Sequence, residues 1–229
     1  MNVILSHPQD TDAIWLYLEL QKNHVEIELV SPEELLMAEE WTQNINNDDD
    51  QFYIKTKKGL EITHNNLNFL FNRTQIAIAP VWDKAQETER QYVQSEMNAL
   101  MMSWLAQVNN KGRIYNPGKG YSLCGVYWSR QQWANAAYKA GFSSVSSENN
   151  LNVNQESVLV IGKKVISNCC NKQLVENCVK LSLLAQTPLL EIYINKDDEN
   201  QFVSANTYPA LSKYGDKLIA ILKHIIYEN

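Results

Sequence analysis

The spacing of apolar residues changes twice within the first thirty residues. Val3-Ile4-Leu5 form a short apolar run, His7-Pro8-Gln9-Asp10 follow, and apolar residues then recur with tryptophan and tyrosine between them as far as Leu20. The run predicts a buried strand, the second segment a turn and the third a helix. Residues 25–30 alternate like a second strand. Because such a crossover is right-handed and makes its strands parallel, the pattern predicts an α/β sheet.

A second pattern covers the next forty residues. Ser31-Pro32-Glu33-Glu34 is typical of a helix start, and we expect a short helix through about Glu40. Residues 44–51 are rich in Asn and Asp and predict a surface loop. The runs 51–55 and 60–63, on either side of a Lys-Lys-Gly turn, predict a hairpin.

The longest helix is predicted from about Lys84, with apolar residues at helical spacing as far as Val108. A short strand is expected at 113–116 and a glycine-containing loop at 117–125. Ser129 to Ala140 predict a further helix that Gly141 closes.

The remaining chain predicts a small α+β module. Strands are expected at 158–161, 165–166, 189–194 and 202–205, and helices at 172–184 and 210–227. The Ser- and Asn-rich residues 143–156 favour a linker. The predicted organisation is therefore an α/β domain with a parallel sheet (1–142), a linker (143–156) and an α+β module (157–229).

Composition and charge exclude several classes. The chain has 229 residues, 45% of them apolar, and its apolar runs are too short to cross a bilayer. A formal net charge of −6, with no basic stripe, argues against sequence-independent binding of nucleic acid. The first residues contain no basic segment and no cleavage site, so we expect no export and a cytoplasmic protein.

Neither a metal nor another cofactor is expected. The four cysteines, Cys124, Cys169, Cys170 and Cys178, lack paired metal spacing and favour reduced, buried thiols. Four histidines supply no catalytic triad and no metal-binding pair. Glu191 and the charged residues 196–199 lack the pattern of a calcium loop and are interpreted as a solvated turn.

Several segments resemble parts of RimK-like ligases of the ATP-grasp superfamily. Residues 3–10 resemble the first strand and turn of the pre-ATP-grasp domain, and parts of 90–141 are similar to the elements that lead into the ATP-binding region. Residues 157–166 resemble the late hairpin of the ATP-grasp core, and 190–192 with 202–206 resemble its closing strands. The resemblance implies a pre-ATP-grasp domain followed by a truncated ATP-grasp remnant.

Two departures from that family change the functional expectation. Only residues 151–156 stand where two nucleotide-enclosing lobes would be needed. The Glu-x-Asn pattern that holds Mg²⁺ in such ligases reads Ser204-Ala205-Asn206 here. Because a serine hydroxyl cannot replace an anionic oxygen ligand of Mg²⁺, the resemblance implies a degenerate relative without nucleotide machinery.

The candidate ligand-binding residues are His7, Asp10, Arg73 and Asn116. His7 and Asp10 follow the first strand, at the edge where open α/β sheets bind ligands, although a cap that stabilises the turn is the favoured interpretation. Arg73 follows an apolar run, and the resemblance implies a loop that faces the substrate cleft, where it could anchor a carboxylate; otherwise it is a surface charge. The loop that begins at Asn116 contains glycines and a lysine but lacks the Walker spacing.

These observations favour a non-catalytic pseudo-ligase that binds a partner protein or peptide, or forms a homodimer, beside a complete ATP-grasp ligase. One alternative is the substrate-binding half of a split carboxylate-amine ligase. Another is a sensor of an amino acid or peptide. On its own the chain is not expected to be an enzyme.

Overall fold

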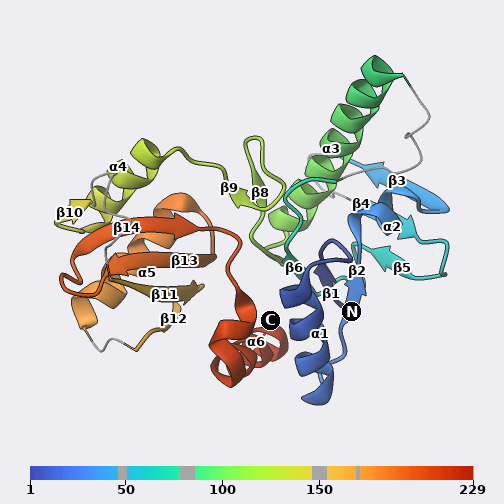
Figure 1. Cartoon of the computed structure of the whole chain (residues 1–229). Helices are drawn as coiled ribbons and strands as arrows, with labels where there is room; N and C mark the ends of the chain where they lie inside the picture. Colours follow the sequence, from blue (N-terminus) through green and yellow to red (C-terminus); the bar gives the residue numbers. More distant parts are fainter. Residues whose placement is uncertain (46–50, 78–85, 146–153, 169–170, 229) are drawn as a thin grey trace. The chain divides into compact units, whose positions relative to one another are not determined.

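The structure of the chain is a computed structural model that describes residues 1–45, 51–77, 86–145, 154–168 and 171–228. It divides into two compact units (Figure 1). Unit 1 comprises Met1–Cys124 with Leu222–Asn229, and unit 2 comprises Gly125–Ile221. Each unit is described by itself below.

A parallel sheet of four strands forms the centre of unit 1. Its strands are β1 (Asn2–Leu5), β2 (Glu28–Val30), β6 (Phe69–Asn72) and β7 (Ile114–Tyr115), in the order β2-β1-β6-β7. Helix α1 (Thr11–Lys22) connects β1 to β2. Val3, Ile4 and Leu5 of β1 are completely buried. The predicted β-α-β unit and α/β class are confirmed.

An antiparallel sheet of three strands also belongs to unit 1. Its strands are β3 (Glu40–Asn44), β4 (Gln51–Lys55) and β5 (Glu61–Thr63). The hairpin of β4 and β5 was predicted, but β3 was not. Helix α2 (Pro32–Leu36) begins at its Ser31 cap as expected and then ends before Glu40. The longer helix was wrong because residues 40–44 instead pair with β4. Most of the expected loop, residues 46–50, lies outside the described residues.

Helix α3 (Glu87–Asn110) supplies the core of unit 1. Its residues Met101, Trp104, Leu105 and Val108 are buried among apolar residues of both sheets. Trp104 meets Trp41 of β3 edge to face, with ring centroids 5.9 Å apart. The predicted long helix is confirmed, although its expected start at Lys84 lies outside the described residues. A short strand, β8 (Gly118–Lys119), follows β7.

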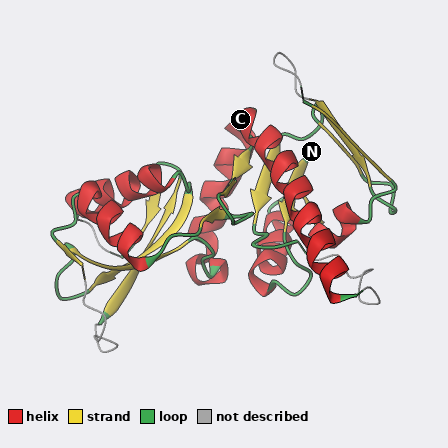
Figure 2. Ribbon diagram, turned by 90° about the horizontal axis from the view of Figure 1, so that it is seen from above, coloured by secondary structure: helices red, strands yellow, loops and turns green. Residues whose placement is uncertain are grey.

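Unit 2 is built on a mixed sheet with the order β10-β14-β13-β11-β12. After β9 (Gly125–Val126), helix α4 (Arg130–Ala140) packs against helix α5 (Lys172–Ala185) and β14, and α5 packs against β11 and β13 (Figure 2). The sheet strands are β10 (Ser144–Val145), β11 (Gln155–Ile161), β12 (Lys164–Ile166), β13 (Leu189–Asn195) and β14 (Gln201–Asn206). All pairs are antiparallel except β10 with β14.

The two units divide at a different place from the expected boundary after residue 142. Helix α4 belongs to unit 2 because it shares a core with α5, in which Trp133 and Ala137 lie beside Leu174 and Cys178. Near the C-terminus, the 3₁₀ helix η2 (Leu211–Tyr214) leads into α6 (Gly215–Glu228), whose second half belongs to unit 1. Of the expected linker 143–156, residues 146–153 lie outside the described part.

No helix within the described ranges has both the length and the apolar character that a membrane crossing requires.

Candidate functional site

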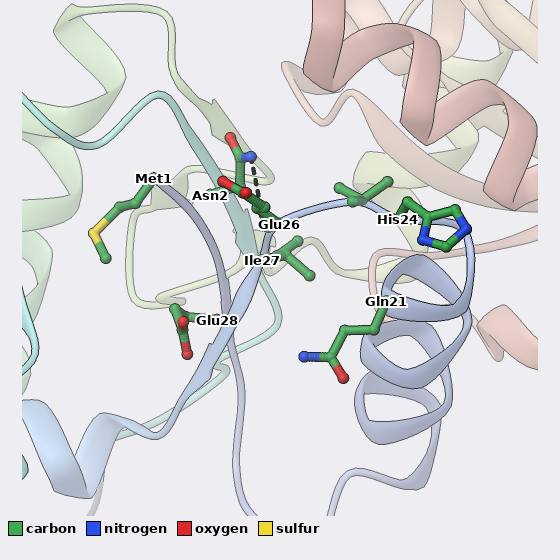
Figure 3. Close-up of a pocket in the computed structure, with 8 residues that line it drawn as sticks. Met1, Asn2, Gln21, His24, Glu26, Ile27 and Glu28 are labelled. Carbon is green, nitrogen blue, oxygen red and sulfur yellow. Dashed lines mark hydrogen bonds between the residues drawn. The ribbon is translucent and has the colours of Figure 1, made fainter.

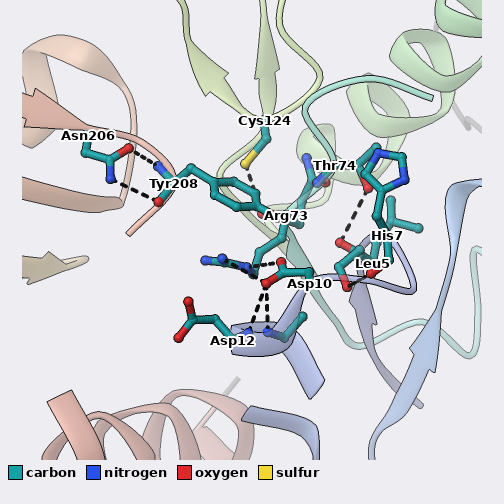
Figure 4. A network of polar contacts seen from close by, with 12 residues as sticks. Leu5, His7, Asp10, Asp12, Arg73, Thr74, Cys124, Asn206 and Tyr208 are labelled. Carbon is teal, nitrogen blue, oxygen red and sulfur yellow. Dashed lines mark hydrogen bonds and ion pairs between the residues drawn. The ribbon is translucent and has the colours of Figure 1, made fainter. Parts of the chain in front are cut away.

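Asp10 and Arg73 form a buried ion pair at the carboxyl edge of the parallel sheet (Figure 4). The Arg73 Nε donates to Asp10 Oδ2 at 2.6 Å, and Nη2 donates to Oδ1 at 3.3 Å. The same Oδ1 accepts from the backbone N–H groups of Asp12 and Ala13, so Asp10 is also the N-cap of α1. Only 2% of the Arg73 side chain and 6% of the Asp10 side chain are exposed.

His7 ties this edge of the sheet to two other segments. Its Nδ1 lies 2.9 Å from Glu33 Oε1 of α2, and its Nε2 lies 2.7 Å from the carbonyl oxygen of Ile76. A carboxylate oxygen and a carbonyl oxygen are both hydrogen-bond acceptors, and each ring nitrogen faces one of them. Both ring nitrogens of His7 are therefore used within the protein.

Asn116 is completely buried, with its backbone at a φ of 58°. Its carbonyl oxygen accepts a hydrogen bond from Asn72 Nδ2 at 2.9 Å, and its side chain is hydrogen-bonded to the Cys124 thiol. The Cys124 thiol also donates to the carbonyl oxygen of Asn72 at 3.1 Å. Burial raises the pKa of Cys124 to about 12, so the thiol stays protonated at neutral pH and is a poor nucleophile.

The structure places all four residues that the sequence analysis selected in unit 1, where the side chains of Asp10 and Arg73 bind each other and those of His7 and Asn116 bind Glu33 and Cys124. Asp10 contacts Arg73 directly, and its backbone N–H donates to the carbonyl oxygen of His7 at 3.0 Å. Asn116 is connected to the pair through Asn72, the neighbour of Arg73 in the chain. Each of the four has contacts inside the protein that fix its position. Binding of a ligand by these residues remains a prediction.

A second polar cluster surrounds Glu191 in unit 2. This carboxylate is only 1% exposed and lies on β13, directly beside Asn206 of β14. Oε1 accepts from the Tyr214 hydroxyl at 2.6 Å and from Lys213 Nζ at 3.2 Å, and Oε2 accepts from the Tyr193 hydroxyl at 2.8 Å. The interpretation of Glu191 as part of a solvated turn was wrong. Its place within the predicted strand 189–194 was the signal that could have identified it.

Lys213 completes this cluster and reaches the surface. Its ammonium donates to Ser157 Oγ at 2.5 Å and lies 5.7 Å and 5.6 Å from the ring centroids of Tyr193 and Tyr214. Half of its side chain is exposed, next to a groove of about 540 Å³. The groove is lined by Ser157, Ile166, Ser167, Asn168 and residues 213–217.

Burial and the Glu191 carboxylate keep both tyrosines protonated. Burial, followed by the hydrogen bond to Glu191, raises the pKa of Tyr193 to about 12. The same two causes, in the same order, raise the pKa of Tyr214. At neutral pH the two phenols are therefore hydrogen-bond donors to the carboxylate.

The residues that match the Glu-x-Asn pattern have other partners. Ser204 lies opposite Tyr193 in the sheet. The Asn206 side chain donates from Nδ2 to the carbonyl oxygen of Tyr208 at 3.0 Å and accepts from its N–H at 2.9 Å (Figure 4). Across the described part of the chain, no group of three or more His, Cys, Asp and Glu residues is arranged to hold a metal ion.

A third feature is a cavity of about 610 Å³ beside the edge strand β2 (Figure 3). Among the described residues, its lining includes Glu26 and Glu28 and neither lysine nor arginine. Asn2 Nδ2 closes one side by donating to the carbonyl oxygen of Glu26 at 2.8 Å. The two carboxylates make this cavity unsuited to a phosphate or another anion.

The chain was compared with known proteins. No protein-family model matches it, and no curated protein was found to match its sequence. Solved structures do match. A RiPP-associated ATP-grasp ligase of Chryseobacterium gregarium, in complex with ADP and a leader and core peptide, superposes with a TM-score of 0.70 at 12% identity, covering 99% of this chain and 96% of that one.

Two further solved structures give the same result. The macrocyclase MdnC of Microcystis aeruginosa MRC, bound with precursor peptide MdnA, has a TM-score of 0.66 at 10% identity over 100% of both chains. The ATP-grasp ligase PsnB, complexed with a minimal precursor, has a TM-score of 0.66 at 10% identity, covering 96% of this chain and 98% of that one. The chain has an ATP-grasp-like fold. At these identities the ATP-grasp-like fold is shared, and the chemistry of each site has to be argued from its own residues.

Proposed function

We propose that this chain is a degenerate, non-catalytic relative of the RimK-like ligases that binds a peptide or a partner protein beside a complete ATP-grasp ligase. The observation that carries the proposal is the state of Glu191. Its carboxylate is buried, and both oxygens are engaged by hydroxyl and ammonium donors of the same unit.

A buried carboxylate beside the Asn206 position is where a cation would be expected if the Mg²⁺ pattern were intact. Here the positive charge near Glu191 is the Lys213 ammonium, 3.2 Å from Oε1. Ser204, in place of the glutamate of the pattern, adds no second anionic ligand. Without a divalent cation, charge that develops on a transferring phosphoryl group has little to stabilise it. This favours a binding role over phosphoryl transfer.

The fold neighbours support the proposed ligand class. Three of the solved structures with this fold contain a peptide or a precursor in addition to the ligase. An ATP-grasp-like chain that keeps the fold and changes the cation site can retain peptide binding after nucleotide chemistry is lost. A precursor peptide, or a ligase that acts on one, is the partner that we propose.

Calorimetry and affinity capture test the proposal together. We expect no heat on titration of the purified chain with ATP in the presence of Mg²⁺, and capture of a complete ATP-grasp ligase or its peptide substrate by the immobilised chain. A Lys213→Met variant is a control for residual cation binding, because it removes the ammonium and leaves Glu191 available. Binding of MgATP by the unmodified chain would contradict the non-catalytic proposal.

The position of Arg73 and Asp10 favours a second candidate. They lie at the carboxyl edge of the parallel sheet, where open α/β sheets bind small ligands. The chain would then be the substrate-binding half of a split carboxylate-amine ligase. In that case ATP hydrolysis should appear only when the chain is mixed with the captured ligase, and an Arg73→Lys variant should raise the KM for the carboxylate substrate more than it changes kcat.

A further inference from the structure

The two edges of the β3-β4-β5 sheet differ. On the β5 side, the Asn66 side chain occupies the edge: Nδ2 donates to the carbonyl oxygen of Glu61 at 2.9 Å, and Oδ1 accepts from the N–H of Thr63 at 2.8 Å. The other edge is β3. This strand contains neither lysine nor proline, the residues that commonly protect sheet edges.

The hydrogen-bond register identifies which groups of β3 face outward. The Phe52 carbonyl oxygen accepts from His64, so Phe52 directs its backbone toward β5 and the next residue, Tyr53, directs its own toward β3. The partner of Tyr53 in the ladder is Thr42. Trp41 and Gln43, on either side of Thr42, therefore direct their N–H and C=O groups to the outer edge.

Helix α3 holds β3 in place for pairing. Gln107 of α3 is buried, accepts from Gln43 Nε2 at 3.0 Å and donates to the carbonyl oxygen of Asn44 at 3.3 Å. Trp41 packs on Trp104 of the same helix. An edge strand that is already fixed loses little conformational entropy when it binds, which favours affinity.

A cavity of about 270 Å³ adjoins one end of this sheet. Thr42, Tyr53 and Thr63 form one cross-strand row of its lining, and Gln43 of the edge strand also contributes. The described residues of its lining are Thr42, Gln43, Asn44, Gln51, Phe52, Tyr53, Thr63, His64 and Asn65. Hydroxyl and amide groups line it together with the apolar parts of Phe52 and Tyr53, so it suits a small side chain that carries both apolar and polar atoms.

Charge distinguishes the other end of β3. Glu40 is its only charged residue and is exposed. Lys55 of β4 lies opposite Glu40, and its Nζ is 2.9 Å from Glu39 Oε2. Glu61 of β5 lies opposite Lys55. The formal net charge of −6 opposes pairing of two copies of the chain. A cationic side chain beside Glu40 is the complementary group.

We propose that the outer edge of β3 binds an extended peptide as an added strand, with a small side chain of the peptide in the Thr42-Tyr53-Thr63 cavity and a basic side chain beside Glu40. Backbone hydrogen bonds at Trp41 and Gln43 supply affinity, and the cavity and the carboxylate supply selectivity. This inference deepens the proposed peptide-binding function and rests on it.

The test begins with a displayed library of short random peptides selected on the full chain. A selected peptide should slow amide hydrogen exchange at Trp41 and Gln43. Only every second backbone N–H of an added strand donates to β3, so N-methylation of that set of peptide residues should abolish binding and N-methylation of the other set should not. Both measurements use the unmodified protein. Exchange that slows elsewhere, with β3 unchanged, overturns the β3 site while peptide binding itself stands.

Two matched pairs of variants sharpen the assignment. Gln43→Pro removes an outward N–H and should lower the affinity for the selected peptide about tenfold or more. Gln43→Ala, which removes only the side chain, should lower it less. Glu40→Lys should lower the affinity for a lysine-containing peptide. Glu61→Lys, on the β5 edge that the Asn66 side chain occupies, should leave this affinity unchanged. Equal losses within each pair would count against the assignment.

Two results would overturn the inference altogether. If selection from the library yields no binding peptide, the result contradicts both the proposed β3 site and the peptide-binding function proposed above. Concentration-dependent protection of Trp41 and Gln43 without any peptide, together with a dimer in sedimentation, would assign this edge to a second copy of the chain instead.

Discussion

One carboxylate, Asp10, connects two elements of unit 1. Oδ1 closes the N-terminus of α1, and Oδ2 receives the Nε of Arg73, which follows β6. Both side chains are more than nine-tenths buried. Loss of one member of such a pair is costly because the charge of the other then remains in a poorly solvated place.

Asp10→Ala should therefore lower the free energy of unfolding by about 3–5 kcal/mol through the broken ion pair, and by about 1 kcal/mol more through the lost cap. Asp10→Asn keeps a capping oxygen and should lose less. Urea unfolding followed by far-UV circular dichroism measures both. Two variants with equal losses below about 1 kcal/mol would show that the pair contributes little to stability.

Tyr193 predicts how stability depends on alkaline pH. Its pKa is raised from 10.0 to about 12 in the folded chain, first by burial and then by the hydrogen bond to Glu191. As the pH rises from 10 to 12, the unfolded chain loses the phenolic proton first, so the free energy of unfolding should fall across this interval. Urea unfolding at a series of pH values measures the slope.

A matched pair of variants isolates that contribution. Tyr193→Phe should make the alkaline slope shallower, whereas Tyr127→Phe, at a site that is 84% exposed, should leave it unchanged. Absorbance of tyrosinate, followed in parallel, identifies the titrating group. An unchanged slope in Tyr193→Phe would exclude this tyrosine as a source of the pH dependence.

Among the elements, those with strong local signals were predictable. Helix α4 has a capping serine at one end and a glycine at the other, and both signals are purely local. Strand β3 was missed because its partner β4 and the helix that supports it, α3, determine its conformation, and neither can be inferred from residues 40–44 alone.

The candidate site shows the same limit. Asp10 and Arg73 were both selected from the sequence, but their contact joins residues 63 positions apart, which no local pattern specifies. Glu191 was missed because it was grouped with the charged residues 196–199, although it stands within the predicted strand 189–194, and because two of its partners are distant in the sequence. Those partners, Tyr214 and Lys213, come from η2, beyond β14 in the chain.

The end of α4 gives a prediction at this scale. Gly141 has a φ of 111°, and a Cβ there would lie 2.7 Å from Asn177 Oδ1 of α5. Asn177 is buried and donates to the carbonyl oxygen of Gly141 at 3.0 Å, so it cannot move without losing this bond. Gly141→Ala should lower the free energy of unfolding by at least about 2 kcal/mol.

Gly112→Ala is the matched control. Its φ of 69° is also left-handed, but a Cβ there meets nothing within 4 Å. Its cost should be confined to backbone strain of about 1 kcal/mol. Thermal unfolding of both variants gives the comparison, and equal shifts in Tm would mean that the contact with Asn177 is irrelevant.

At the scale of the whole molecule, each unit has its own apolar core. Residues of β1, β6 and α3 form one, and residues of α4, α5 and the mixed sheet form the other. Helix α6 belongs to both units, because residues from Leu222 onward are part of unit 1. There Leu222 and Ile226 are buried, and the Tyr227 hydroxyl donates to the carbonyl oxygen of His24 at 3.1 Å.

Ile226→Ala should accordingly destabilise unit 1, by about 2–5 kcal/mol if the side chain leaves a cavity. Amide hydrogen exchange should accelerate in β1 and β6 and stay unchanged in β11 and β13. Tyr227→Phe, which removes one hydroxyl from a residue that is 64% exposed, is the mild control. Equal acceleration in both units would show that they unfold together.

Because α6 contributes residues to both units, it also affects the order in which the units can fold during synthesis. Domains usually fold in the order in which the ribosome produces them. Here the polypeptide that completes the first unit, residues 222–229, emerges after every residue of the second. The nascent first unit must therefore wait, with the apolar surface that Leu222 and Ile226 will cover still open to water, and the unit translated later can be the first to finish folding.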